Sequence, residues 1–224
     1  MRDVAALAVR LGLAPGSALL RQALTHSSYA AEHDVESNER LEFLGDAVVG
    51  LAVADYIIGR FPQVNEGAAS VIRSRVVNED SLADVARRLG LGESMRLGRG
   101  VVKERGAERA SLLADAFEAV VAAVYLESGY EAARDVVVHH LEAAIVDASR
   151  AADTLDAKTR LRRWCEEQGL PAPDYEVSSS GPSHDVTFRA TVRVGDVVAS
   201  AEGPSKKRAE ANAAALAWGE VDNA

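Results

Sequence analysis

The fold of this chain is decided by one stretch, Asn38-Glu39-Arg40-Leu41-Glu42-Phe43-Leu44-Gly45-Asp46-Ala47. Its carboxylates Glu39, Glu42 and Asp46 are spaced i, i+3 and i+7, so a helix presents them from one face. The apolar remainder predicts that the helix is buried, and it comprises Leu41, Phe43, Leu44, Val48 and Val49. Two like charges about 4 Å apart repel by roughly 4 kcal/mol at an effective dielectric near 20. The cluster therefore predicts a bound cation or a carboxyl group that stays protonated.

A second acid pair, Asp115 and Glu118, is spaced i, i+3 within another apolar segment, and Glu66 is a further acid beside a turn. Oxygen ligands without nearby His or Cys suit Mg²⁺ or Mn²⁺ rather than zinc. Carboxylates on two facing helices can hold one or two such ions, which activate a water and stabilise the leaving oxygen in phosphodiester hydrolysis. From spacing alone, acids on solvated helix faces remain the alternative to a metal site.

Apolar residues at helical spacing fill the first 150 residues, which predicts an almost entirely helical domain over residues 1–148. Ser111 is the predicted N-cap of the helix that carries Asp115 and Glu118. The predicted helices are Val4–Leu13, Leu19–Ala23, Leu41–Ile58, Ala68–Val77, Leu82–Leu89, Leu112–Leu126 and Ala132–Val146.

The pattern changes after a polar segment, residues 149–156, which we interpret as a flexible linker. In Asp185–Val194 apolar and polar residues alternate, which predicts a half-buried strand, and Gly195-Asp196 forms a hairpin turn after it. The order over residues 157–224 is α-β-β-β-α. Its predicted elements are Thr159–Gln168, Tyr175–Ser180, Asp185–Val194, Val197–Ala201 and Ser205–Trp218.

Composition limits the possible functions. The chain has 224 residues, a net charge of −9 and a single cysteine, Cys165, so neither an intrachain disulfide nor a cysteine metal cluster is expected. No apolar run approaches the roughly 20 residues that cross a bilayer, and the N-terminus lacks a signal-peptide layout, so we expect a cytoplasmic protein without membrane contact. Both halves are net acidic, which by itself argues against a nucleic-acid partner.

The stretch Asn38–Val48 resembles the signature of the ribonuclease III family. The similarity continues through Leu24–Tyr29, Phe61–Gly67 and Ser111–Ala119. The resemblance implies that Mg²⁺, with Mn²⁺ able to substitute, binds four catalytic acids, of which Glu118 is the one most directly tied to hydrolysis. They are Glu42, Asp46, Asp115 and Glu118. It also implies that Glu39 and Glu66 organise the site and hold substrate.

The C-terminal module resembles a double-stranded RNA-binding domain, through its element order, Gly181–Asp185 and Ser205–Glu210. The resemblance implies that His184 reaches a minor groove and that Lys206 and Lys207 contact phosphates. On charge alone, a basic surface turn is the alternative.

This module departs from the family pattern in two places. Arg162 and Arg163 stand where the family usually has Gln-Glu; we assign them to RNA binding through phosphate, and the alternative is that they do not contact RNA. Ala201 and Pro204 interrupt the usual approach to the last helix.

Two further segments each allow two interpretations. His26 could act as a general base, but Leu24–Tyr29 more simply predicts a hydrogen-bonded structural turn. The segment Gly98–Arg109 contains four cationic residues among glycines, which fits either an ordinary mobile loop or a contact with RNA.

The resemblance implies a bacterial-type ribonuclease III with an all-α endonuclease domain and an α+β double-stranded RNA-binding domain. It further implies a homodimer with two active sites facing one cleft, no small-molecule cofactor, and products with 5′-phosphates, 3′-hydroxyls and short 3′ overhangs. The expected substrates are ribosomal RNA precursors and certain messenger and transfer RNAs. The rivals are a non-catalytic double-stranded RNA-binding regulator and a metal-dependent phosphatase acting on small substrates.

Overall fold

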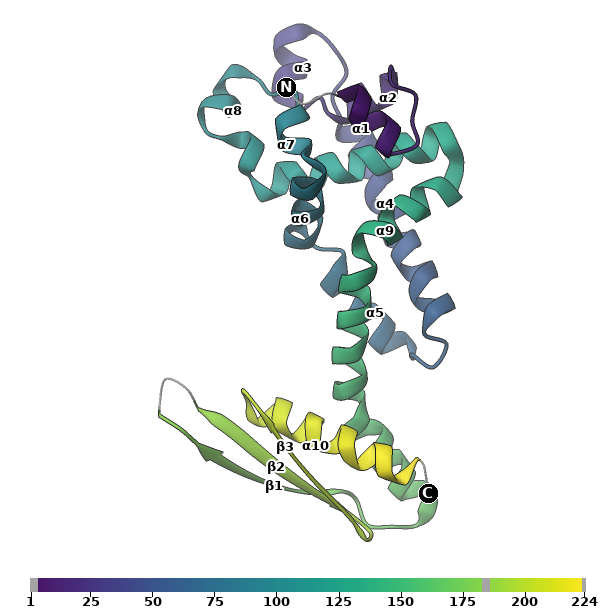
Figure 1. Cartoon of the computed structure of the whole chain (residues 1–224), viewed down its shortest axis with the longest axis vertical. Coiled ribbons are helices and arrows are strands. Elements are labelled where there is room, and N and C mark those ends of the chain that lie inside the picture. Colours follow the sequence, from purple (N-terminus) through teal and green to yellow (C-terminus); the bar gives the residue numbers. More distant parts are fainter. Residues whose placement is uncertain (1–3, 183–185, 223–224) are drawn as a thin grey trace. The chain divides into compact units, whose positions relative to one another are not determined.

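The computed structural model describes residues 4–182 and 186–222. The chain divides into two compact units, Met1–Val146 and Asp147–Ala224, and each is described by itself (Figure 1). Residues 149–156 are helical, because they fall within the long α9 (Ala110–Gln168). The domain boundaries at 148 and 157, with a linker between them, stay a prediction.

The first unit is helical throughout, as the sequence predicts. Its elements are α1 (Val4–Arg10), α2 (Ala18–Ala23), α3 (Ser27–His33), α4 (Glu39–Arg60), α5 (Glu66–Val76), α6 (Glu79–Leu89), α7 (Leu91–Ser94), α8 (Arg99–Lys103), the 3₁₀ helix η1 (Gly106–Glu108) and the beginning of α9. Sequence analysis did not predict α3, α7, α8 and η1, because elements of three to seven residues are too short to show a helical period.

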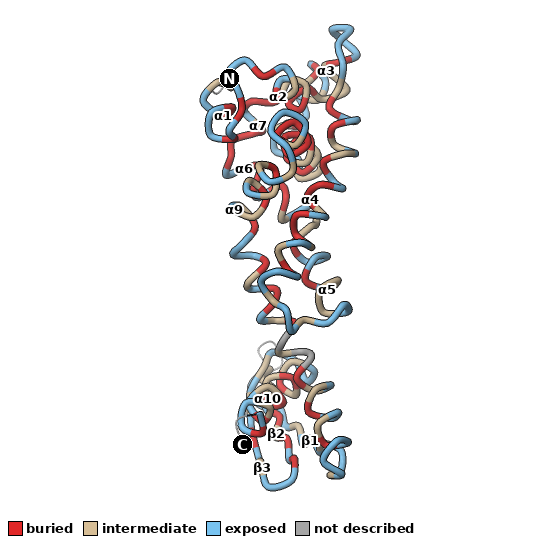
Figure 2. Tube along the Cα trace, turned by 90° about the vertical axis from the view of Figure 1, so that its right-hand side faces the viewer, coloured by how far each residue is buried: buried red, intermediate tan, exposed pale blue. Residues whose placement is uncertain are grey.

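The core of this unit lies around α4 and the part of α9 before Gly129. Residues 119–124 of α9 are all buried, and a helix that is apolar on every side belongs in a protein interior (Figure 2). Gly129 interrupts α9 with a φ of 84°, a left-handed conformation that glycine adopts without steric cost.

Two predictions about these helices are wrong. Ser111 does not cap α9, because the helix begins at Ala110. Phe43 is not buried: it is 83% exposed, and Leu51 and Ile58 of the same helix are 56% and 64% exposed. Helix α4 therefore has a buried side that includes Leu41, Val48 and Val49, and a second, exposed apolar side.

The second unit is a three-stranded antiparallel sheet covered by helices. Its elements are the end of α9, then β1 (Asp174–Ser180), β2 (Thr187–Val194), β3 (Val197–Gly203) and α10 (Lys206–Val221), with sheet order β1-β2-β3. In β2, Ala190, Val192 and Val194 are buried, while the residues between them face outward. Figure 1 shows α10 lying along the sheet.

Small side chains allow α10 to approach the sheet closely. A Cβ added at Gly203 would lie 2.7 Å from the backbone nitrogen of Ala209. The predicted final helix is confirmed, and it begins one residue later than predicted: Ser205 is its N-cap, and the Ser205 hydroxyl accepts a hydrogen bond from the Arg208 N–H at 3.3 Å. His184 lies outside the described residues. Among those residues, the chain has no helix with the length and apolarity to span a bilayer.

Candidate active site

Two helices bring the predicted acids together. Glu39, Glu42 and Asp46 lie in the first two turns of α4, and Asp115 and Glu118 lie near the start of α9. The helices touch where Gly45 meets Glu118: a Cβ at Gly45 would overlap the carbonyl group of Glu118. Only glycine permits this backbone contact, and it places the acids on either side of Gly45 beside Glu118.

The charges of these acids influence one another. Burial, followed in order of importance by the charges of Asp46, Asp115 and Glu42, raises the pKa of Glu118 from 4.5 to about 8. The pKa of Glu42 is also raised, by burial first and then by Asp115, Glu39 and Asp46. Four carboxylates from two helices thus share one electrostatic environment. At neutral pH Glu118 holds its proton unless a cation is bound.

Two residues that sequence analysis did not assign to the site act on Asp115. Burial and the charge of Glu79 raise the pKa of Asp115, and His26 lowers it. Glu79 is the first residue of α6, directly after its N-cap Asn78. The capping pattern is visible in the sequence, but only the fold shows that this end of α6 is near Asp115.

His26 has the structural position that the sequence favours. Its ring accepts a hydrogen bond from the Ser28 N–H at 3.1 Å and caps α3. The same ring nitrogen, Nδ1, lies 2.8 Å from the Ser28 hydroxyl. His26 is therefore held in place by α3 while its charge reaches Asp115.

The donor set fits a hard divalent cation in chemical type, because every candidate ligand is a carboxylate oxygen. Within residues 4–182 and 186–222, however, no three His, Cys, Asp or Glu side chains are arranged as a ready-made metal site. The carboxylates share a region without converging on one point, as expected of like charges that repel.

The two auxiliary acids lie differently from the four. Glu39 is exposed, accepts a hydrogen bond from the Ser37 hydroxyl at 2.8 Å, and acts on the site only through Glu42. Glu66 begins α5, accepts a hydrogen bond from Ser70 at 2.9 Å, and lines a pocket of about 220 Å³ beside Ile58. It is not among the groups that shift the pKa values of the other acids. Within a single chain, Glu66 thus lies apart from the other acids of the site.

The cationic segment Gly98–Arg109 is folded rather than an open loop, since it contains α8 and η1. The Gly98 N–H donates to the Ser28 hydroxyl and the Arg99 N–H to Glu32, both at 2.9 Å. These bonds anchor the segment to α3, the helix that His26 caps. Its four cationic side chains, Arg99, Lys103, Arg105 and Arg109, are exposed.

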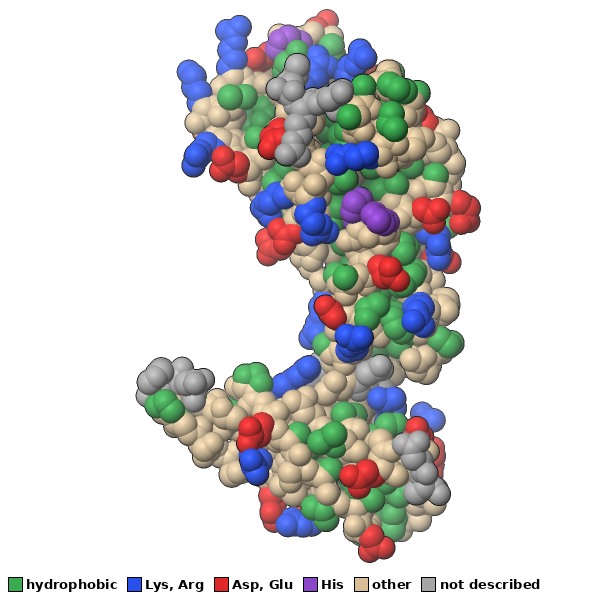
Figure 3. Space-filling view, in the orientation of Figure 1, with side chains coloured by type: hydrophobic (Ala, Val, Ile, Leu, Met, Phe, Trp, Pro, Cys, Tyr) green, Lys and Arg blue, Asp and Glu red, His purple; other side chains and the backbone are tan. Residues whose placement is uncertain are grey.

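In the second unit the predicted RNA-binding cations fall into two groups. Arg162 pairs with Glu166 at 3.3 Å, and Arg163 with Glu167 at 3.1 Å. Lys206 and Lys207 are exposed at the start of α10 and have no ion-pair partner in the described part of the chain. Basic and acidic side chains alternate over the face in Figure 3.

Comparison with known proteins decides the family. A ribonuclease-III-like family model matches residues 16–145, and a double-stranded RNA binding motif matches residues 157–220. The chain belongs to the ribonuclease III family. Ribonuclease 3 of Corynebacterium jeikeium is 48% identical over 197 residues, covering 88% of this chain and 81% of that protein. Ribonuclease 3 of Thermobifida fusca is 47% identical over 202 residues, covering 89% and 84%.

A solved structure agrees with this assignment. The nuclease domain of ribonuclease III from Campylobacter jejuni, in which a region involved in dimer formation is flexible, is 36% identical to the chain. It has a TM-score of 0.59 and covers 63% of this chain and 98% of that one. The predicted family, fold class and endoribonuclease activity on double-stranded RNA are confirmed, and the non-catalytic alternative is not favoured. Ribonucleases III depend on divalent metal, and this family member is expected to share that requirement.

Proposed function

We propose that Glu42, Asp46, Asp115 and Glu118 hold Mg²⁺, with Mn²⁺ able to replace it, and that phosphodiester bonds of double-stranded RNA are hydrolysed there. The observation that carries this proposal is the pKa of Glu118, raised to about 8 within a cluster of like charges. The metal would supply Lewis-acid stabilisation of the phosphoryl and leaving oxygens and an activated water.

The protein's own contribution is to position the acids. The Gly45 contact fixes the backbone of Glu118 against α4, so its carboxylate has a defined starting point. Glu118 loses its proton when a cation enters, because the cation reverses the electrostatic cost of ionising it. Glu39 and Glu66 are assigned to organising the site and holding substrate, which agrees with their exposed positions.

RNA is held by cations of both units. Lys206 and Lys207 contact phosphates at the N-terminus of α10, where backbone N–H groups also point outward. Arg162, Arg163 and His184 complete the predicted surface on the second unit. The exposed arginines of Gly98–Arg109 contact the duplex from the nuclease unit. The anchoring of this segment to α3 supports that role, because a fixed segment can hold RNA in register.

The chain acts as a homodimer with its active sites facing one cleft. The exposed apolar side of α4 supports this, since Phe43, Leu51 and Ile58 lie on one helix and are open to solvent in a single chain. Large exposed apolar surfaces of this kind mark protein contacts. Each site would cut one strand, leaving 5′-phosphates, 3′-hydroxyls and short 3′ overhangs. Ribosomal RNA precursors and some messenger and transfer RNAs are the proposed substrates.

One assay tests the activity. The full chain is incubated with a long perfect RNA duplex and Mg²⁺, beside a single-stranded RNA of the same sequence and a sample with chelator. We expect cleavage of the duplex alone and only with metal, to products with 5′-phosphates. Equal cleavage of the single strand, or cleavage in chelator, would contradict the proposal.

A second assay tests the RNA-binding surface independently of catalysis. Replacing Lys206 and Lys207 by Ala should weaken duplex binding equally across sequences and reduce the salt slope by about one per phosphate contact. Binding is measured by fluorescence anisotropy at several salt concentrations, without divalent metal. An unchanged slope would remove these lysines from the RNA contact.

A further inference from the structure

The nuclease unit contains a pocket of about 590 Å³ that none of the proposed catalytic or RNA-binding groups explains. This volume lies within the roughly 300–1,000 Å³ typical of small-molecule sites. Its apolar wall comes from segments far apart in the chain and includes Leu24, Met95, Leu97 and Val102. Leu24 and Met95 are buried and belong to the rigid core, whereas Val102 is exposed at the edge.

The charged groups of the pocket are of one sign. Arg21 and Arg96 line it, and no acidic residue among the described ones does. The Arg96 guanidinium lies over the Tyr29 ring at 4.2 Å and donates to the Tyr29 hydroxyl at 2.9 Å. It forms no ion pair with a carboxylate in the described chain. Arg21 is exposed and likewise has no acidic partner there.

The hydrogen-bonding capacity left in the pocket belongs mainly to donors. The Tyr29 hydroxyl accepts from Arg96, which leaves its own proton available. Ser17 is already engaged, since its hydroxyl accepts from the Leu20 N–H at 2.9 Å and donates to Glu127. The Ser94 hydroxyl donates to the Gly90 carbonyl at 3.1 Å. A ligand that supplies acceptors and negative charge, on an apolar body, is complementary to this lining.

We propose that this pocket binds a small amphiphilic anion, a carboxylate, sulfonate or phosphate monoester on an apolar group, whose head is held by Arg21 and the Tyr29 hydroxyl. The apolar body packs between Leu24, Met95 and Leu97. Its position suggests a consequence for the enzyme, because Arg96 leads directly into the cationic segment Gly98–Arg109. A ligand that fills the pocket stabilises that segment from beneath.

Two fluorescent probes that differ by one charge test the proposal on the full chain. The anionic probe is 8-anilinonaphthalene-1-sulfonate, and the neutral one is N-phenyl-1-naphthylamine, which has the same aromatic body. Arg21→Met should weaken the anionic probe about tenfold or more, the effect of losing one charge-assisted hydrogen bond, and leave the neutral probe unchanged. Arg75→Met, an exposed arginine of α5 outside the pocket, serves as the control and should change neither.

A third variant identifies the place of binding. Val102→Trp puts a large side chain at the exposed edge of the pocket without disturbing the buried core, and it should abolish binding of both probes. Octanoate, but not 1-octanol, should then displace the anionic probe from the wild-type chain. The proposal is overturned if neither probe binds saturably, if Arg21→Met affects both probes equally or neither, or if Val102→Trp leaves binding intact.

Discussion

The acids of the nuclease unit and the cations of the RNA-binding unit have opposite surroundings. Around Glu118, burial and then the neighbouring carboxylates together raise its pKa to about 8. Around Arg162 and Arg163, each cation has a glutamate of its own one helical turn away. The first arrangement is costly for the free protein and is relieved only by a cation or a proton. The second arrangement is favourable in the free protein, so RNA phosphates must compete with the glutamates for the two arginines.

This difference shows how an acidic chain can act on RNA. The nuclease unit gathers mutually repelling carboxylates in the free fold, an arrangement that a bound cation would stabilise. In the RNA-binding unit, Arg162 and Arg163 are paired with glutamates, whereas Lys206 and Lys207 have no ion-pair partner among the described residues. The affinity of this unit for RNA should therefore be modest and strongly dependent on salt.

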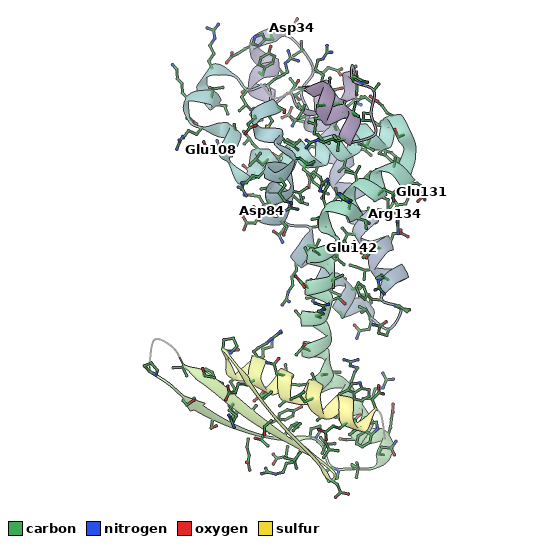
Figure 4. All side chains as sticks on the ribbon, viewed as in Figure 1. Asp34, Asp84, Glu108, Glu131, Arg134 and Glu142 are labelled. Atoms are coloured by element: carbon green, nitrogen blue, oxygen red, sulfur yellow. The ribbon has the colours of Figure 1, made fainter. Side chains whose placement is uncertain are left out.

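The largest effect should come from Glu118→Gln. Losing this carboxylate should slow duplex cleavage by at least about 10³-fold, because metal-dependent stabilisation is worth several kcal/mol and each 1.36 kcal/mol is tenfold in rate. Duplex binding should be nearly unchanged. Glu131→Gln is the matched control, since Glu131 lies on the same helix beyond Gly129 and points outward (Figure 4). Full activity of the Glu118 variant would remove this residue from the mechanism.

Gly45→Ala should destabilise the nuclease unit by about 1–3 kcal/mol, the usual cost of forcing extra atoms into a packed site. The added Cβ overlaps the backbone of Glu118, so α4 and α9 must separate, and cleavage should fall as well. Gly59→Ala is the control in the same helix: nothing lies within 4 Å of its Cβ position, and its stability should be unchanged or slightly higher. Urea unfolding measures the stability of both variants. An equal change in the free energy of unfolding for Gly45→Ala and Gly59→Ala would contradict the predicted contact.

The acid cluster should also give stability an unusual dependence on pH. Between the ordinary glutamate pKa of 4.5 and about 8, Glu118 keeps its proton in the folded state but loses it in the unfolded chain. The folded state then binds more protons, so without divalent metal this residue's contribution to stability falls as pH rises through that range.

The difference in melting temperature between wild type and Glu118→Gln, followed against pH in chelator, isolates the contribution of Glu118. The variant should become relatively more stable with increasing pH, and millimolar Mg²⁺ should reduce the difference. A difference that is independent of pH would mean that Glu118 ionises normally.

The smallest effect should come from Glu166→Gln/Glu167→Gln, which releases Arg162 and Arg163. Exposed pairs of this spacing are worth about 0.3–0.5 kcal/mol each, so duplex affinity should rise about threefold to fivefold. Glu220→Gln/Asp196→Asn removes the same charge elsewhere in the unit and should give a smaller increase. Equal increases would show that only net charge matters, and that the two ion pairs do not restrain the arginines.

Much of this protein could be predicted from local patterns. The spacing of Glu42 and Asp46, and of Asp115 and Glu118, indicated two acid-bearing helices, because helical periodicity is a property of a few consecutive residues. The change from a period of 3.6 to a period of 2 after residue 156 separated the helical part from the sheet. The small residues of the final helix were also a local signal.

The errors came from features that depend on distant partners. Phe43 has the hydrophobicity of a core residue, but its position on α4 turns it to solvent, so no sequence pattern could distinguish an inner apolar face from an outer one. The contribution of Glu79 depends on where α6 begins in space relative to Asp115. The spacing of Arg162 and Glu166 allows an ion pair along the helix, but the sequence could not show that the two side chains form that pair and do not extend into solvent.

Residue type and short-range spacing were enough to predict the acids, the longer helices and the family that the chain resembles. The contact of Gly45 with the backbone of Glu118, the raised pKa values of Glu42, Asp115 and Glu118, and the pocket that Arg21 lines became visible only in the folded chain. The physical reason is that Coulomb energy and close packing depend on distances through space, which chain order does not fix.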